Sequence, residues 1–536
     1  MMSNISWYSA DLRQRLELCL QYNCEILDRD LNQEPFFGIR RCKDGTAQAF
    51  HLTDIGIPHI TGRALDTIYS IESSTGIRCP EAVEQVYVDY LFSCCDLPDN
   101  LPVFRDPQVC DGRPVVEFHN LRECLEALVW LVKLRGSRRA LRVIDGFLDT
   151  LLGLTNPETK SLDPALLGNF PEEKQRKFHR LGEISPTMGQ GRLVGPLVLL
   201  YQETGNTHAL QLAQWYAEST MEVCFDSLGT IRDEAFTHVH SITSTLSGVL
   251  ALGMATSNPV LCAQVRQIYE HGLRSAYSTY GYCKEHLYLP TQQGESNQVG
   301  DLIQIQLMLA KMESPALWYS RAEKFMRGGI LPAQVLEPRQ CILPTLSPQS
   351  DAQRDMEKRA LGGFGFPNPS CHLTEPDSII NTIDITQGAA QAICAFSRQI
   401  VTQDPLGIRV NLLFDCDSPL AQVQSALPRK GIITITPKID SNLAVRIPEN
   451  LVPGTFTVQV NGRQCEFYEL DGYAYVTKLP AGSRLELTFE PAHFLKKEFI
   501  NHREYTVEWY GEQAIGVSEQ EGIYPLFGDF FDEETE

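Results

Sequence analysis

The sequence lacks the surplus of basic residues that a nucleic acid or an anionic membrane would require. It has 46 Lys and Arg against 67 Asp and Glu, which gives a formal net charge of −21, and phosphate contact depends on clustered Lys and Arg. The longest basic stretch, residues 174–180, is short and mixed, as is typical of a solvated loop. We therefore expect neither a nucleic acid nor a membrane as a partner.

Long apolar runs and a leader segment are also missing. No run approaches membrane-spanning length, and residues 1–20 have neither a basic start followed by an apolar stretch nor a small-residue cleavage site. This pattern predicts a cytoplasmic protein. The 16 cysteines are scattered through apolar helical segments, as Cys19, Cys124 and Cys394 illustrate, and we expect them to be reduced core residues.

Several motifs that bind cofactors are absent. The sequence has no phosphate-cradling glycine loop, no GxSxG elbow and no dinucleotide fingerprint. Two patterns suggest a metal site, namely HVH at residues 238–240 and the vicinal Cys94 and Cys95. The two histidines would diverge on a helix, and the cysteines end a segment expected on the outside of the fold. We predict no metal and no cofactor.

Apolar residues recur at helical spacing through roughly the first 400 residues, with turn signals at 73–76, 203–206 and 255–259. This periodicity predicts a mainly α protein whose helices pair as six hairpins in an (α/α)6 barrel. The predicted helices are 11–28, 61–73, 80–95, 119–135, 138–154, 191–203, 207–224, 239–254, 259–277, 296–311, 315–331 and 387–401.

After Pro405 the pattern changes to alternating runs such as GIITITPKI and RLELTFEP, separated by Gly, Pro and Asn. Such alternation predicts an antiparallel β-sandwich. We therefore divide the chain into a barrel domain, 1–404, and a C-terminal sandwich with an acidic tail, 405–536. The stretch 332–385 is rich in Pro and Gly and is predicted to form an elaborated loop over the mouth of the barrel.

The predicted hairpins are asymmetric, because each second helix follows a polar stretch whereas each first helix follows a short turn. This asymmetry suggests an inner ring of helices whose N-termini gather at one mouth, where free N–H groups favour hydroxyl-rich or anionic ligands. The alternative is that the polar residues there cap helices and satisfy buried backbone groups. The candidate sugar-binding residues at these helix starts are His59, Arg63, His119, Asn120, Gln190, Arg192, His238, His240, Asn297 and Gln387.

Carboxylates decide whether glycoside hydrolysis is plausible. The reaction needs a protonated group at the leaving oxygen and a second group that acts as base or nucleophile. The candidates are Asp233 and Glu234 in IRDEAFTHVHS, Glu285 in YCKEHLYLP and Glu295 in QQGESNQVGDL. Glu295 follows Gly294 at a predicted helix start, where a capping role is equally natural.

Several stretches resemble the β-L-arabinofuranosidases of glycoside hydrolase family 127 and its relatives. VNLLFDCDSPLAQVQSALPRKGIITI, LAVRIPE, VQVNG and DGYAYVTKLPAGSRLELTF are similar to the strands of that family's sandwich. The resemblance covers most of the chain and implies a six-hairpin barrel followed by β-sandwich material.

Two barrel helices resemble the helices that carry the family's zinc. GESNQVGDLIQIQLMLAKM is similar to the helix that opens with Glu-Thr-Cys, which puts Glu295 at the metal-binding glutamate and Asn297 at a metal-binding cysteine. DITQGAAQAICAFSRQIV is similar to the helix that opens with paired cysteines, one of them the nucleophile, but Thr386 and Gln387 stand there. The resemblance thus implies that the zinc-thiolate mechanism is absent, with Glu285 nearest to the family's acid/base glutamate.

The leading hypothesis is an exo-acting glycoside hydrolase that releases a terminal arabinofuranoside, uronide or rhamnoside by carboxylate-based acid/base catalysis without zinc. Two alternatives stay open. One is a polysaccharide lyase or uronide-processing enzyme, in which a His or Tyr base acts while Arg63 or Arg192 neutralises a substrate carboxylate. The other is a catalytically silent carbohydrate-binding protein. The expected partners are a short oligosaccharide or glycoside and a second copy of the chain in a homodimer.

Overall fold

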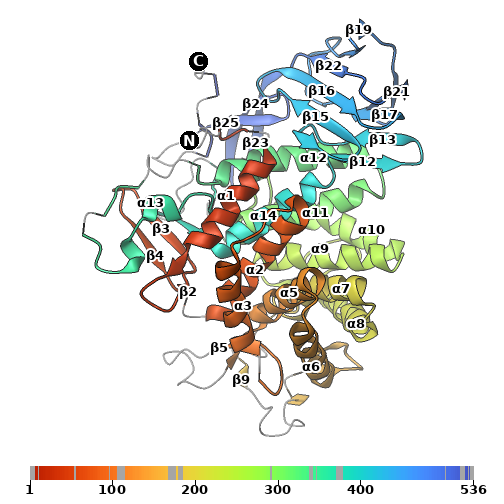
Figure 1. Cartoon of the computed structure of the whole chain (residues 1–536). Coiled ribbons are helices and arrows are strands. Elements are labelled where there is room, and N and C mark those ends of the chain that lie inside the picture. Colours follow the sequence, from red (N-terminus) through yellow and green to blue (C-terminus); the bar gives the residue numbers. More distant parts are fainter. Residues whose placement is uncertain are drawn as a thin grey trace.

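Figure 1 shows the computed structural model of the chain, in which helices fill one part and strands the other. The residues that the structure describes are 6–9, 11–52, 56–95, 97–104, 115–163, 165–166, 177–178, 185–289, 293–336, 342–345, 347–369, 378–500, 502–518, 526–528 and 530–531.

Six helices form a closed inner ring. Each packs against the next in chain order, and the last packs back on the first. They are α2 (Gly56–Thr75), α5 (Phe118–Arg135), α7 (Gln190–Thr204), α9 (Val239–Ala255), α11 (Ser296–Ala310) and α14 (Ile383–Ser397). These are the second helices of the predicted hairpins, which confirms the (α/α)6 barrel.

Six further helices surround this ring, each packed on one or two inner helices. They are α1 (Leu12–Glu25), α3 (Glu81–Cys95), α6 (Arg138–Leu154), α8 (Thr207–Cys224), α10 (Pro259–Gln267) and α12 (Pro315–Phe325). Local signals fix several of their ends. The side chains of Asp11, Ser137, Asn206 and Asn258 cap the starts of α1, α6, α8 and α10. Gly136 ends α5 in the left-handed conformation, with φ of 60°.

Several predicted helices differ from the observed ones at their ends, and the helix predicted over 61–73 spans Gly56–Thr75. The segments predicted as 259–277 and 315–331 are α-helical only to Gln267 and Phe325, and each continues as a π-helical turn, at Ile268–Gly272 and Met326–Ile330. The helix predicted over 387–401 begins at Ile383, because Thr382 caps it, and it ends at Ser397.

The C-terminal strands form the predicted sandwich. One sheet has the order β12 (Val401–Asp404), β13 (Gly407–Val410), β17 (Ser441–Arg446), β21 (Tyr473–Leu479) and β20 (Tyr468–Leu470). The other has the order β14 (Cys416–Asp417), β15 (Ala421–Ser425), β16 (Gly431–Pro437), β22 (Leu485–Phe489), β18 (Thr457–Val460) and β19 (Arg463–Gln464). Buried and more exposed residues alternate along β16, as expected for a strand with one face on the core.

Two features of the sandwich differ from the prediction. Strand pairing already begins at Val401, before the predicted boundary at 405, because β12 pairs with β13. In addition, β13 and β17 run parallel, although the sheets are otherwise antiparallel in the described residues. A further sheet of β23 (His493–Ile500), β24 (Arg503–Tyr510) and β25 (Gln513–Val517) follows the sandwich.

The stretch predicted as a loop, 332–385, contains two strands in its described part. β10 (Phe364–Gly365) and β11 (Ser378–Thr382) pair with the N-terminal β3 (Gly38–Cys42) and β4 (Ala47–Phe50) in the order β10-β11-β3-β4. Because β11 ends at Thr382, which caps α14, this sheet lies beside the start of an inner helix. Residues 337–341, 346 and 370–377 of this stretch lie outside the described residues.

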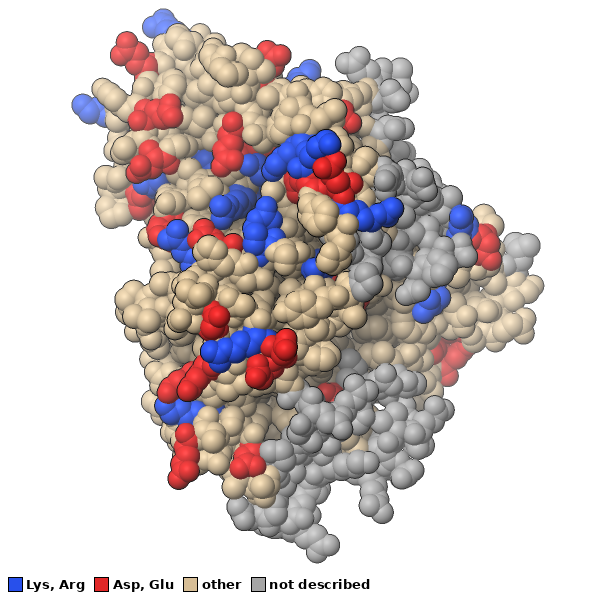
Figure 2. Space-filling model, turned by 180° about the vertical axis from the view of Figure 1, so that it is seen from behind, with Lys and Arg blue, Asp and Glu red and all other residues tan. Residues whose placement is uncertain are grey.

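The remaining strands each have two residues: β1 (Leu27–Asp28), β2 (Glu34–Pro35), β5 (Val103–Phe104), β6 (Val115–Val116), β7 (Thr155–Asn156), β8 (Ser161–Leu162) and β9 (Lys177–Phe178). Among the described residues, no helix combines the length and the apolar character needed to cross a bilayer. On the face drawn in Figure 2, Lys and Arg are interspersed with Asp and Glu rather than gathered in one basic patch.

Candidate active site

The N-terminal turns of the inner helices meet at one end of the barrel. Several of these helices start without a side-chain cap, since the N-cap residues of α5, α9 and α11 are Glu117, His238 and Glu295, and none of them makes a side-chain capping hydrogen bond. Capping therefore does not account for His238 and Glu295. Their side chains are available for another role.

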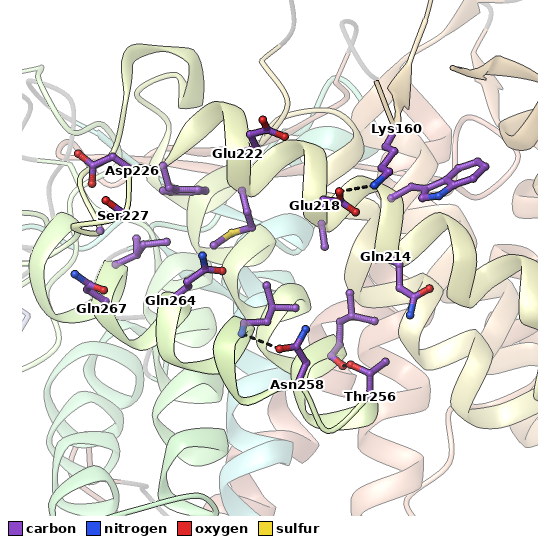
Figure 3. A pocket seen from close by; sticks show the side chains of 18 of the residues that line it. Lys160, Gln214, Glu218, Glu222, Asp226, Ser227, Thr256, Asn258, Gln264 and Gln267 are labelled. Carbon is purple, nitrogen blue, oxygen red and sulfur yellow. Dashed lines mark hydrogen bonds and ion pairs between the residues drawn. The ribbon is translucent and has the colours of Figure 1, made fainter. Parts of the chain in front are cut away.

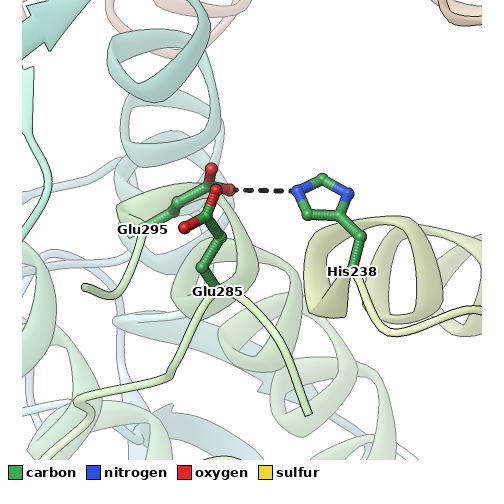
Figure 4. A group of neighbouring side chains, drawn as sticks. All are labelled: His238, Glu285 and Glu295. Carbon is green, nitrogen blue, oxygen red and sulfur yellow. Dashed lines mark ion pairs between the residues drawn. The ribbon is translucent and has the colours of Figure 1, made fainter. Parts of the chain in front are cut away.

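His238, Glu285 and Glu295 converge at this mouth. One ligand atom from each lies within 4.8 Å of the other two, and Figure 4 shows the two carboxylates side by side, facing the imidazole ring. Nε2 of His238 lies 3.7 Å from Oε2 of Glu295. Sequence spacing could not reveal this cluster, because the three residues come from one loop and two helix starts.

Backbone pairing holds this cluster in place. The peptide N–H of Val239 donates to the carbonyl of Glu285 at 2.8 Å, and Glu285 in turn donates to the carbonyl of Gln293 at 3.1 Å. The loop that carries Glu285 is thus fixed between the start of α9 and the approach to α11. On the far side of the ring, Nδ1 of His238 lies 2.9 Å from Oγ of Ser241.

Beneath this cluster lies a buried network of charged residues. Arg63 contacts both Glu123 and Asp384 at 3.0 Å, and Arg192 contacts Glu123 at 3.0 Å. The next two contacts extend the network around the ring. Nε2 of His240 lies 3.1 Å from the Arg63 guanidinium, and Nδ1 of His240 lies 2.8 Å from Asp301. Every inner helix thus contributes at least one residue to the network. Helix α14 also contributes Gln387, which bonds Arg63.

Burial and neighbouring charge set the protonation of this network. Burial would raise the pKa of Glu123, but the Arg192 and Arg63 guanidiniums bring the pKa well below its usual range. Burial and the same two arginines lower the pKa of His240 far below its usual value, so its ring is neutral. Burial also raises the pKa of Asp301 to about 6, despite the nearby arginines.

Buried polar atoms without a hydrogen-bond partner are concentrated at this mouth. Among the described residues they include both ring nitrogens of His59, Nε and Nη1 of Arg192, Oε2 of Glu295 and Oδ1 of Asn297. His59 is only 2% exposed, and its Nε2 lies 3.8 Å from Oδ1 of Asp384. Since most buried polar groups in folded proteins are paired, this concentration points to a ligand that completes the pairing.

The structure gives the other predicted residues these surroundings. The Gln190 amide bonds Ser219 and the backbone of Leu162, so it links α7 to the outer ring. His119 lies 3.4 Å from Glu117, and burial lowers the pKa of His119 to about 4. Asn120 is fully buried near the start of α5. Asp233 and Glu234 are exposed on a 3-10 turn, Asp233–Ala235, and no described contact joins them to Glu285 or Glu295.

Sequence reasoning missed six acidic and basic residues that share this core. They are Asp66, Arg122, Glu123, Glu126, Asp301 and Asp384. The sequence signal that could have found them is a charged residue within the apolar repeat of a predicted helix. A charge on the buried face of an inner helix needs a partner.

One of these residues gives the protein an expected pH dependence. Burial, with a contribution from the charge of Asp66, raises the pKa of Glu126 from 4.5 to about 7. The folded chain then binds the proton more tightly than the unfolded chain, so the free energy of unfolding falls as pH rises from about 4.5 to about 7. Glu126→Gln removes this loss while its amide still accepts from Gln391. The free energy of unfolding is measured by urea denaturation. We expect the difference between variant and wild type to grow in the variant's favour by on the order of 2 kcal/mol from pH 5 to pH 8. An unchanged pH dependence would contradict the raised pKa.

The residues at the positions of the family's zinc ligands do not fit a thiolate-bound zinc. The Thr386 hydroxyl donates to the carbonyl of Thr382 at 2.7 Å and accepts from the N–H of Phe364 at 3.0 Å. The Gln387 amide is held between Arg63 and Asp66. Close packing also fills the space, since a Cβ at Gly388 would lie 2.6 Å from Cα of Asn297. The positions that the resemblance assigns to cysteines carry Asn297, Thr386 and Gln387.

A separate cavity of about 770 Å³ lies on the outer ring, between α8 and α10. Its wall includes Trp215, Glu218, Gln264 and Gln267, and Figure 3 shows Glu218 paired with Lys160 at its edge. None of the predicted site residues lines this cavity, so we place the candidate site at the barrel mouth.

No protein-family model matches the sequence, and no curated protein matches it. Solved structures do share the fold. A GH127 β-L-arabinofuranosidase from Geobacillus stearothermophilus T6 aligns with a TM-score of 0.56 and 13% identity, over 94% of this chain and 80% of that chain. A GH127 β-arabinofuranosidase aligns at 0.57 with 14% identity, over 94% and 81%. A third structure, called a glycoside hydrolase, aligns at 0.54 with 12% identity, over 91% and 84%. The chain therefore has the six-hairpin barrel and β-sandwich fold of the GH127 β-arabinofuranosidases, as the sequence resemblance implied.

Proposed function

We propose that this protein is an exo-acting glycoside hydrolase in which Glu285 is the general acid/base and Glu295 is the nucleophile. The observation that carries the proposal is the convergence of these two carboxylates with His238, within 4.8 Å, at the mouth of a six-hairpin barrel. A pair of carboxyl groups is what glycoside hydrolysis requires.

The short separation favours a retaining reaction. Carboxyl groups about 5–5.5 Å apart act as nucleophile and acid/base, whereas inverting enzymes need roughly 6.5–9.5 Å to admit a water. Glu285 is the less buried of the two, with 23% of its side chain exposed against 8% for Glu295. It is therefore better placed to exchange protons with solvent.

The proposed reaction has two steps. Glu285 donates its proton to the glycosidic oxygen as the bond to the anomeric carbon breaks, and a Glu295 oxygen bonds to that carbon. Glu285 then takes a proton from water, whose oxygen displaces Glu295 and restores both carboxyl groups. The unpartnered nitrogens of His59 and Arg192 and the amide oxygen of Asn297 supply hydrogen bonds to sugar hydroxyls.

The buried network favours a neutral terminal sugar. Arg63 already pairs with Glu123 and Asp384, so its charge is not available for a substrate carboxylate. Among the expected substrates this favours an arabinofuranoside or a rhamnoside over a uronide. The uronide-processing alternative rests on Arg192, because Nε and Nη1 of its guanidinium have no described partner.

The test is hydrolysis of a panel of aryl arabinofuranosides, rhamnosides and uronides by the full chain, with and without chelator. We expect turnover of a neutral glycoside that survives chelation and releases a sugar of unchanged anomeric configuration, followed by ¹H NMR. An inverted product would assign the carboxylates other roles. Turnover confined to uronides would favour the alternative, and no turnover on any glycoside would favour a silent binding protein.

A further inference from the structure

We propose that His238, Glu285 and Glu295 together bind one divalent transition-metal ion of the class that includes Zn²⁺, and that the bound ion inhibits the enzyme. The inhibition rests on the proposed function, whereas the binding does not. The proposed ligands are one imidazole nitrogen and two carboxylates, a different set from the thiolates that the family resemblance implied.

The distances suit ligands of a single ion. Zinc lies about 2.0–2.2 Å from nitrogen and oxygen ligands, so two tetrahedral ligands lie roughly 3.5 Å apart. The His238–Glu295 separation of 3.7 Å is close to this value and is too long for a hydrogen bond. Glu285 lies within 4.8 Å of both. A shift of about 1 Å in this partly exposed side chain would complete the set.

Glu295 provides an independent sign of a missing partner. It is 6% exposed, its Oε2 has no hydrogen-bond partner among the described residues, and it occupies a helix N-cap without capping the helix. The same oxygen is the one that faces His238. A buried, unpaired carboxylate oxygen is costly unless a ligand binds it.

Ser241 orients the imidazole for binding. In the tautomer whose Nδ1–H donates to Oγ of Ser241, at 2.9 Å, Nε2 keeps its lone pair and faces Glu295. Metal-binding histidines characteristically fix their second nitrogen in this way. A bound ion would also remove the acid and the nucleophile, because a metal-bound Glu285 cannot carry a proton and a metal-bound Glu295 is not free to attack.

The experiment titrates ZnCl₂ into the chelator-stripped full chain by calorimetry, and records the visible spectrum with CoCl₂. We expect one ion per chain and a Co²⁺ spectrum without thiolate charge-transfer bands. Glu295→Gln and His238→Ala should weaken binding by about 100-fold or more, and Ser241→Ala by about 10-fold. The matched controls Glu222→Gln and His271→Ala, both exposed on outer elements, should leave it unchanged.

Three outcomes would overturn the site: no saturable binding by wild type, thiolate bands, or variants that bind as wild type does. Circular dichroism shows whether each variant is folded, and Ser241→Ala keeps the test valid if His238→Ala does not fold. Binding without any turnover would reject the proposed function and keep the site. Turnover that Zn²⁺ leaves unchanged, in protein that binds it, would reject the inhibition.

Discussion

Glu285→Gln is expected to lower kcat by about 10²–10⁴-fold for a phenyl glycoside, the usual contribution of a general acid/base. The loss should be far smaller for bond cleavage in a dinitrophenyl glycoside, because that leaving group departs without a proton. Glu295→Gln should lose turnover on both substrates, since no nucleophile remains. The measurement is pre-steady-state release of the phenol, which isolates cleavage of the first bond from hydrolysis of the intermediate.

The comparison of two leaving groups separates the two roles. Glu285 is held by its backbone carbonyl, which accepts from Val239, and this contact is retained in the glutamine variant. An equal loss on both substrates would show that Glu285 is not the acid. His271→Ala, on an exposed turn, is the control for a nonspecific change.

Arg446→Met is expected to destabilise the protein by about 3–5 kcal/mol, because it leaves the buried Glu512 without its guanidinium partner and leaves Glu323 with Arg327 alone. Arg446 contacts Glu512 at 3.0 Å and also pairs with Glu323, and its Nε donates to the carbonyl of Asn411 at 2.7 Å. The side chains of Arg446 and Glu323 are fully buried. These residues join barrel helix α12 to the sandwich strand β17 and to the turn before β25, so the substitution weakens the junction between them.

The free energy of unfolding from urea denaturation tests this expectation. Arg484→Met is the matched control, because Arg484 pairs with Glu486 at the surface and is 62% exposed, where a pair contributes about 1 kcal/mol or less. Combining Arg446→Met with Glu512→Gln should restore part of the loss, since Glu323 still pairs with the buried Arg327 and no carboxylate of this cluster is then left without a cation. A loss below about 1 kcal/mol for Arg446→Met alone would mean that water or another cation replaces the guanidinium.

The sequence by itself determined the twelve long helices and the change to strands, because apolar periodicity and turn residues act over a few residues and survive in any context. It also placed His238 and Glu295 near helix starts at the mouth and singled out Glu285 as a candidate carboxylate. The observed helix ends differ from the predicted ones where a local contact sets them. Thr382 caps α14, so this helix begins at Ile383, four residues before its predicted start.

Only the tertiary structure decided which of these residues meet. His238 lies far from Glu285 and Glu295 in the chain, and the sequence left open a capping role for Glu295 that the fold does not use. Asp384, Glu123 and Asp301 gained their roles because closing the ring brings charged and polar side chains from six helices into one buried space. There each must find a partner, since a lone buried charge is too costly to keep.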